Sequence, residues 1–215
     1  MGSPKVDEIG PWSEVKLDIL KRYAVEYSKI LSSQKNPSFF HVYIDAFAGT
    51  GFHLSKATGE MVLGSPLNAL LDPYGLTLDW KVIQEAGTMQ SLDIFINFPI
   101  YDININVLHH DQKTVLPLHI ERMNAYWGDE SWRSVAYEKS HGLFETMEEK
   151  VSNRRMAEAF RERLKTVAGF TRVPEPLPIR NGKGSIVYYL FFASHKGTAE
   201  NIVTYIFDKF ARQRI

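Results

Sequence analysis

The stretch Tyr43-Ile44-Asp45-Ala46-Phe47-Ala48-Gly49-Thr50-Gly51 decides the expected fold. Residues 39–45, which lead into it, are mostly aromatic or β-branched, and such a run is typical of a buried strand. Gly49 and Gly51 let the backbone turn tightly after this strand and approach a ligand without a Cβ in the way. The stretch therefore predicts a strand that carries an acid, Asp45, at its end and continues into a glycine loop.

Strand and helix patterns alternate around this loop. Apolar residues recur at helical spacing before it, and Ser13 is a suitable N-cap. The expected elements are a helix over 13–32, a small hairpin over 52–63, strands over 69–75 and 92–99, and a helix over 78–89. Alternation of this kind predicts an α/β protein with a parallel sheet.

The second half of the chain is expected to complete the same domain. The pattern blurs over 101–150, which we interpret as a mostly helical insertion. A helix over 152–167, extended segments over 170–179 and 185–193, and a last helix over 198–212 follow it. Asn181-Gly182-Lys183-Gly184 between the extended segments predicts a C-terminal β-hairpin. No repeat or linker divides the chain, so residues 1–215 are expected to form a single domain.

Composition excludes several classes of protein. The 25 Lys and Arg residues balance the 25 Asp and Glu residues, so the chain lacks the broad basic field of a protein that binds duplex DNA regardless of sequence. It has no cysteine, which excludes disulfides and thiolate metal sites. No apolar stretch approaches the ~20 residues that cross a bilayer. We expect a cytoplasmic protein without membrane contact, in which any contact with nucleic acid is local.

A second turn, Asp72-Pro73-Tyr74-Gly75, also follows an expected strand. Parallel strands end at the same edge of a sheet, so this turn and the glycine loop are expected to share one crevice. Asp72 offers a hydrogen-bond acceptor and Tyr74 a flat face for a planar substrate. Two alternatives stay open: the glycines serve only a structural turn, and Asp72-Pro73 is an ordinary turn with a packed tyrosine.

Other polar motifs point less clearly to a site. His109-His110-Asp111 lacks a third ligand at suitable spacing, so we expect no metal. The run Trp127-Gly128-Asp129-Glu130-Ser131-Trp132 either walls a pocket or packs the insertion, and His195 follows a strand without further sign of a base. The cations after Ser152 alternate with Glu158 and Glu162, which favours a solvated face over a nucleic-acid track. Those cations are Arg154, Arg155, Arg161, Arg163 and Lys165.

Six motifs together resemble the three-Cys-motif partner protein family, TcmP, along nearly the whole chain. The first three are Ile9-Gly10-Pro11-Trp12-Ser13-Glu14-Val15-Lys16, the Tyr43 to Gly51 stretch and Leu71-Asp72-Pro73-Tyr74-Gly75-Leu76. The others are Asn97-Phe98-Pro99-Ile100, the Trp127 to Trp132 run and Tyr188-Tyr189-Leu190-Phe191-Phe192-Ala193-Ser194-His195.

This resemblance implies a bacterial or archaeal cytoplasmic protein with a Rossmann-like, methyltransferase-type fold that binds S-adenosylmethionine. The methionine side of the cofactor would contact Asp45, Phe47, Ala48, Gly49 and Gly51. The turn at the transfer site would comprise Asp72, Pro73 and Tyr74. It also implies a three-cysteine-motif protein as a partner.

The chain departs from the methyltransferase pattern between its two candidate turns. Asp45 and Asp72 are 27 positions apart, which leaves about five residues, 66–70, for the crossover helix. Five residues span only ~7.5 Å, whereas a helix that returns along a strand needs about a dozen. We therefore expect a sheet that lacks two strand–helix units, with a segment missing near Leu70-Leu71. Alternatively, Asp72 is itself the ribose-binding acid of a compact βαβ unit.

Two functions follow from these expectations. The first is an S-adenosylmethionine-dependent methyltransferase-like protein of unknown acceptor, in which Asp72, Pro73 and Tyr74 orient the acceptor atom. The second is a non-catalytic protein that keeps the fold and acts by binding another protein, because a fold does not dictate an activity. The shortened crossover and the missing ribose acid favour the second.

Overall fold

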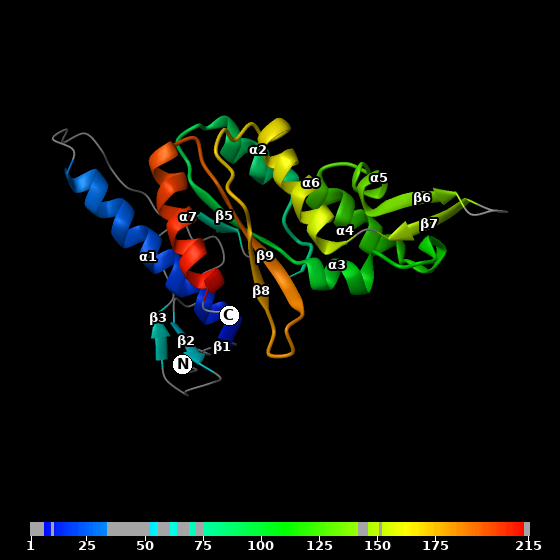
Figure 1. The fold of residues 1–215 in the computed structure, drawn as a ribbon, viewed down its shortest axis with the longest axis horizontal. Coiled ribbons are helices and arrows are strands. Elements are labelled where there is room, and N and C mark those ends of the chain that lie inside the picture. The colour runs from blue at the N-terminus through cyan, green and yellow to red at the C-terminus, as the bar shows by residue number, and fades with distance from the viewer. Residues whose placement is uncertain are drawn as a thin grey trace, which may run out of the picture.

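A computed structural model describes residues 7–9, 11–33, 52–55, 61–63, 69–71, 75–141, 146–150 and 152–212. Its centre is a four-stranded sheet with the order β4-β5-β9-β8 (Figure 1). These strands span Ala69–Leu71, Ile94–Phe98, Ile186–Ala193 and Leu177–Arg180, respectively. β4 and β5 are parallel and joined through helix α2 (Trp80–Thr88), whereas β9 is antiparallel to both β5 and β8.

The expected parallel Rossmann-like sheet is therefore wrong. In the four-stranded sheet only β4 and β5 run parallel. The chain returns to this sheet through the hairpin β8–β9, and β9 enters beside β5 from the opposite direction. A second, three-stranded sheet pairs β1 (Asp7–Ile9) parallel with β2 (Phe52–Ser55) and β2 antiparallel with β3 (Met61–Leu63). The expected hairpin over 52–63 is confirmed, but its strands lie outside the main sheet.

Helices cover both faces of the four-stranded sheet, because side chains alternate along each strand. On one face, Phe95, Leu190 and Phe192 pack with residues of α1 (Pro11–Ser33) and α7 (Gly197–Arg212). On the other face, Ile96, Phe98 and Phe191 pack with residues of α2 and of four further helices. These are α3 (Ile100–Asn106), α4 (Pro117–Trp127), α5 (Trp132–Ala136) and α6 (Asn153–Thr166). The sheet thus separates two buried clusters.

Helix ends follow local sequence signals. The Ser152 side chain accepts a hydrogen bond from the Arg155 amide, 3.3 Å away, which confirms the expected cap of α6. Asp79 caps α2 by accepting from the Lys81 amide at 2.9 Å. Pro117 begins α4, and Gly128, with a φ of +97°, ends it. Local chemistry therefore sets these boundaries.

Residues 101–150 include most of α3, the short 3-10 helix Gln112–Thr114, α4 and α5. They also hold β6 (Tyr137–His141) and β7 (Thr146–Lys150), which pair as an antiparallel hairpin. This hairpin projects from one end of the molecule (Figure 1). The charged stretch that we expected within a mostly helical insertion thus forms two strands. Among the described residues, no helix is long and apolar enough to span a membrane.

Candidate functional site

The carboxyl ends of β4 and β5 form the edge of the sheet where the sequence predicts a ligand site. Leu71, the last residue of β4, pairs with Ile96 of β5, so the parallel strands end at the same edge. The predicted turn at Asp72 follows Leu71 directly, and Asn97 and Phe98 end β5. Ligands of open α/β sheets bind beyond the carboxyl ends of parallel strands. We call this edge the carboxyl-end site.

Gly75, the last residue of the predicted turn, lies beside Asp102 of α3. Its φ is +63°, a conformation that favours glycine, and a Cβ built on it would lie 3.3 Å from the Asp102 Oδ2 atom. The other carboxylate oxygen, Oδ1, accepts a hydrogen bond from the Asn106 side chain at 2.8 Å. One oxygen of Asp102 is thus held by its own helix, while the other lies beside Gly75 and can accept a hydrogen bond from an N–H or O–H group.

The end of β5 is rigidly packed. Asn97 is 7% exposed, and its carbonyl oxygen accepts a hydrogen bond of 2.8 Å from the Tyr126 hydroxyl. The Phe98 ring packs on Phe160 with 4.7 Å between centroids, so α4 and α6 both support this strand end. Sequence reasoning missed Asp102 and Tyr126 as parts of this edge. Asp102 lies four positions before Asn106, a spacing at which two side chains of one helix can form a hydrogen bond. This spacing was the available sequence signal that Asn106 orients the Asp102 carboxylate.

The eight residues that the sequence predicts for binding and transfer lie outside the described residues. They are Asp45, Phe47, Ala48, Gly49, Gly51, Asp72, Pro73 and Tyr74. Their roles and their expected shared crevice therefore stay predictions. Leu70 and Leu71, where we suspect a missing segment, lie within β4 and pair with Phe95 and Ile96.

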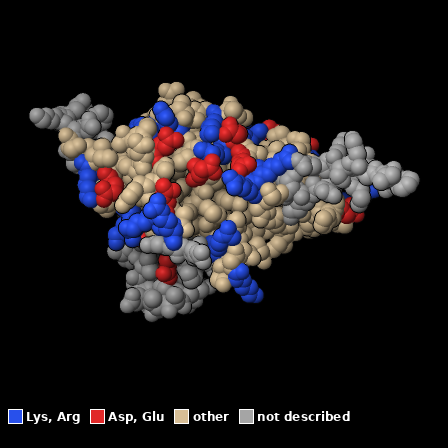
Figure 2. All heavy atoms as spheres, viewed as in Figure 1, with Lys and Arg blue, Asp and Glu red and all other residues tan. Residues whose placement is uncertain are grey.

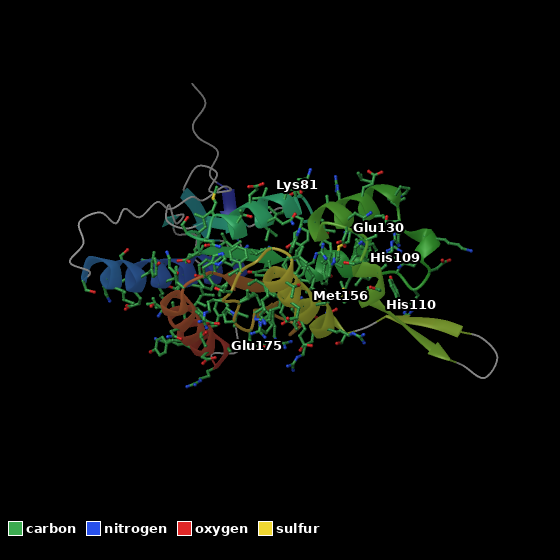
Figure 3. All side chains as sticks on the ribbon, turned by 90° about the horizontal axis from the view of Figure 1, so that it is seen from above. Lys81, His109, His110, Glu130, Met156 and Glu175 are labelled. Atoms are coloured by element: carbon green, nitrogen blue, oxygen red, sulfur yellow. The ribbon has the colours of Figure 1, made fainter. Side chains whose placement is uncertain are left out.

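His109 and His110 lie toward the end of the molecule that carries the β6–β7 hairpin (Figure 3). The His109 ring contacts the Thr114 Oγ1 atom at 2.9 Å and the Ile105 carbonyl oxygen at 2.7 Å. The carboxylate of Asp111 accepts a hydrogen bond of 3.0 Å from the Lys113 amide. Over the described ranges, no three His, Cys, Asp or Glu side chains gather as metal ligands. The hydrogen bonds of His109 and Asp111 instead hold the loop that follows α3.

The Trp127 to Trp132 run packs against α2 and α6. We call Trp80, Trp127, Gly128, Asp129, Ser131 and Arg163 the tryptophan cluster. The Arg163 guanidinium lies over the Trp80 ring at 4.9 Å and donates hydrogen bonds to the Trp127 carbonyl oxygen at 2.6 Å and to Asp129 at 2.5 Å. The Trp127 indole donates to Ser131 at 2.9 Å. These contacts favour the packing alternative for this motif over a pocket wall.

Electrostatics in the tryptophan cluster favour a charged Asp129. Burial raises the pKa of the Asp129 carboxyl, but hydrogen bonds from Ser131 and Arg163 outweigh burial and lower that pKa below its ordinary value. The Asp129 side chain is half exposed, while that of Arg163 is largely buried. The ion pair therefore fixes the loop between α4 and α5 onto α6.

A second polar network lies at the opposite end of β5 from the carboxyl-end site. Asp93 accepts hydrogen bonds from the Tyr23 hydroxyl at 2.9 Å and from the Ser194 hydroxyl at 2.6 Å. The Lys196 ammonium donates to the Tyr27 hydroxyl at 3.0 Å. Burial of Lys196 lowers its pKa, but the Tyr27 hydrogen bond and the Asp93 charge outweigh burial and raise it. This network, which we call the Asp93 network, links α1 to β5 and to the start of α7.

His195 also has a packing role. Its ring stacks on Phe170 with 5.2 Å between centroids, and its Nε2 atom donates a hydrogen bond of 2.9 Å to the Gly87 carbonyl oxygen. Gly87 lies close to the backbone that follows α6, since a Cβ on Gly87 would lie 1.9 Å from the Ala168 carbonyl oxygen. His195 thus joins α2 to the segment after α6.

The cations of α6 are largely neutralised by ion pairs. Arg154 pairs with Glu158 at 2.8 Å and Lys165 with Glu162 at 2.7 Å. Arg161 pairs with Glu175, and Arg163 with Asp129. Figure 2 shows basic and acidic side chains intermixed across this part of the surface. The arrangement favours a solvated, ion-paired face over a track for phosphates.

Comparison of the chain with protein-family models, with curated proteins and with solved structures finds no match. The resemblance to the three-Cys-motif partner family therefore rests on the sequence motifs alone.

Proposed function

We propose that the chain binds S-adenosylmethionine at the carboxyl-end site and is a methyltransferase-like protein. The observation that supports this proposal is the parallel pairing of β4 with β5 through α2. It brings the end of β4, which precedes Asp72, beside the end of β5. Ligands of open α/β sheets bind beyond two such neighbouring strand ends.

The described side chains at this edge fit a ligand that carries N–H or O–H donors. Asp102 presents one carboxylate oxygen toward Gly75, and Asn106 holds the other. In the proposal, Asp45, Phe47, Ala48, Gly49 and Gly51 hold the methionine side of the cofactor. Asp72, Pro73 and Tyr74 align the acceptor. S-Adenosylmethionine supplies an activated methyl group, so the chain contributes mainly binding and alignment.

A calorimetric titration with S-adenosylmethionine tests this proposal. Wild-type protein is expected to bind with a dissociation constant in the micromolar range, about −8 kcal/mol. Gly49→Val places a branched side chain in the proposed loop and is expected to abolish binding. Gly182→Val is the matched control, because a Cβ at Gly182 meets no atom within 4 Å and this glycine lies in the β8–β9 turn. No heat from wild type at millimolar cofactor would refute the proposal.

The second candidate is a non-catalytic protein that acts by binding another protein, such as a three-cysteine-motif protein. One observation favours it. Between β2 and β4, the described residues form only the antiparallel strand β3, so they include no parallel strand that would carry a ribose-binding acid. The same titration separates the candidates, because this one requires no cofactor.

A further inference from the structure

Helices α1 and α7 lie side by side on one face of the four-stranded sheet (Figure 1). A groove of about 490 Å³ is lined by residues of both helices. Ile30, Ile202 and Ile206 supply aliphatic lining. Tyr205 lies at the same groove and is 70% exposed. Exposure of so large a side chain beside the half-buried Ile30 and Ile202 marks a surface that can bury more apolar area.

The lining of the groove has a helical period on both sides. Ile202, Tyr205, Ile206 and Lys209 recur at three- and four-residue steps along α7. Arg22, Glu26 and Ile30 recur at four-residue steps along α1. A helix laid in such a groove presents its own apolar side chains at the same steps. The groove thus has the kind of lining that accommodates an amphipathic helix.

Uncompensated positive charge adjoins one part of this groove. Lys209 lines it, and Arg212 follows three positions later on the same side of α7. Within the described ranges, neither Lys209 nor Arg212 forms an ion pair. Glu26, the acid in the lining, is already paired with Lys29 at 2.8 Å. Arg22 is paired with Asp18 at 2.9 Å and lies over the Phe210 ring.

The contrast with α6 makes this charge informative. Four cations of α6 pair with acids of this chain, whereas Lys209 and Arg212 form no ion pair within the described ranges. Figure 2 shows basic side chains gathered over the region of α1 and the C-terminal half of α7. An occupant that combines apolar side chains with acidic ones complements both properties of the surface.

We propose that the groove between α1 and α7 binds an amphipathic helix of a protein partner, with apolar side chains toward Ile202 and Ile206 and acidic side chains toward Lys209 and Arg212. This inference deepens the second candidate function by naming the surface and the chemistry of the partner. It is measured separately from cofactor binding, so either proposal can fail alone.

The test uses the full 215-residue chain and a fluorescent synthetic peptide. The peptide is about 18 residues long, with Leu at helical spacing, a few Glu beside them and Ala at the other positions, because Ala favours the helix and many neighbouring Glu would oppose it. One control peptide has the same composition with alternating Leu, and a second has Lys in place of Glu. Fluorescence anisotropy is expected to show micromolar binding of the first peptide and at least about tenfold weaker binding of both controls.

Substitutions locate the binding site. Tyr205→Glu and Lys209→Glu are each expected to weaken binding at least about tenfold. Tyr101→Glu on α3 and Lys81→Glu on α2 make the same changes at exposed positions elsewhere and are expected to leave binding unchanged. Circular dichroism establishes that each variant is folded, and a variant that unfolds is replaced by Tyr205→Ser or Lys209→Gln.

Several results would overturn the proposal. One is absence of peptide binding, and another is binding that Tyr205→Glu and Lys209→Glu leave intact. Binding to anionic phosphatidylserine vesicles but not to the peptide would assign the surface to a membrane instead. Self-association in sedimentation, lost in Tyr205→Glu, would assign it to a second copy of this chain.

Discussion

Gly128 packs directly against Trp80: a Cβ built on Gly128 would lie 2.5 Å from the Cδ1 atom of the indole ring. Trp80 is 3% exposed and is also covered by the Arg163 guanidinium, so its ring cannot move aside freely. Two features therefore require glycine at position 128: its φ of +97°, and the lack of room for a Cβ beside the Trp80 ring. This contact joins the end of α4 to the start of α2.

Gly128→Ala is expected to lower the free energy of unfolding by about 2–4 kcal/mol, because it combines backbone strain with a steric clash in a packed region. Gly184→Ala is the matched control. Gly184 also has a positive φ, +82°, but nothing lies within 4 Å of its Cβ position, so only the strain of about 1–2 kcal/mol remains. Urea unfolding measures both. Equal losses would contradict the close packing of Gly128 on Trp80.

Arg163→Met is expected to destabilise the protein by about 1–3 kcal/mol. The change keeps the aliphatic stem but removes the hydrogen bonds to Trp127 and Asp129 and the contact with the Trp80 ring. Arg154→Met is the control on the same helix, since Arg154 forms an exposed ion pair with Glu158, and its midpoint in urea is expected to stay unchanged. A similar effect of the two variants would show that the tryptophan cluster adds no stability.

The Asp129 ion pair predicts a dependence of stability on acid pH. Because the folded-state pKa of Asp129 is lowered, its contribution is present above the unfolded-state pKa and is lost as the pH falls through the folded-state pKa. The stability difference between wild type and Asp129→Asn is therefore expected to shrink between about pH 6 and about pH 3. The stability difference should stay below about 1 kcal/mol, since the Asp129 side chain is half exposed. A difference that does not depend on pH would contradict this assignment.

The Asp93 network predicts a dependence at alkaline pH. Burial raises the pKa of the Tyr27 hydroxyl, and the pKa of Lys196 is raised as well. Both groups stabilise the fold below their unfolded-state pKa values, and this contribution is lost as the pH rises through their folded-state values. Thermal unfolding of wild type is thus expected to shift to lower temperature above about pH 10, with a smaller shift in Tyr27→Phe. The same slope in both proteins would rule out this role for Tyr27.

Local elements of the fold could be predicted because local chemistry sets them. Ser152 caps α6 as its side chain and position suggest, and the helix pattern over 78–89 corresponds to α2. Asn181 and Gly184 form the turn between β8 and β9, where the Gly184 amide donates to the Asn181 carbonyl oxygen at 2.9 Å. Each of these signals acts within a few residues.

The direction of the strands could not be predicted in the same way. Phe95 pairs with Phe192 across almost a hundred positions, and nothing in either strand specifies the partner or its orientation. The alternation of strands and helices correctly gave the parallel pair β4–β5 but wrongly suggested the same direction for the other strands. Likewise, the charged residues 138–150 lack a helical apolar face, and residues 138–141 and 146–150 of this stretch lie in the strands β6 and β7.

The roles of the predicted site residues stay untested, and the structure bears only on the strands that precede them. Asp72 directly follows β4 and Asn97 lies near the end of β5, and the structure pairs these two strands in parallel. The approach of Asp102 to Gly75 depends on how α3 packs, which no spacing in the sequence reveals. For the same reason, the contact of Arg163 with Trp80 could not be distinguished beforehand from a solvated cation.

Nuclear magnetic resonance with S-adenosylmethionine tests the carboxyl-end site most directly. In amide spectra of the labelled protein, addition of cofactor is expected to shift the signals of Gly75, Asn97 and Asp102. The signal of Gly169 is expected to stay in place, because Gly169 adjoins Phe170, which stacks on His195 at the opposite end of the sheet. Asp102→Asn keeps the size of the side chain but removes its charge. This variant is expected to bind the cofactor more weakly, so the same shifts should appear only at higher cofactor concentration. Absence of shifts at Gly75 and Asp102, or shifts confined to Tyr205 and its neighbours, would contradict the account.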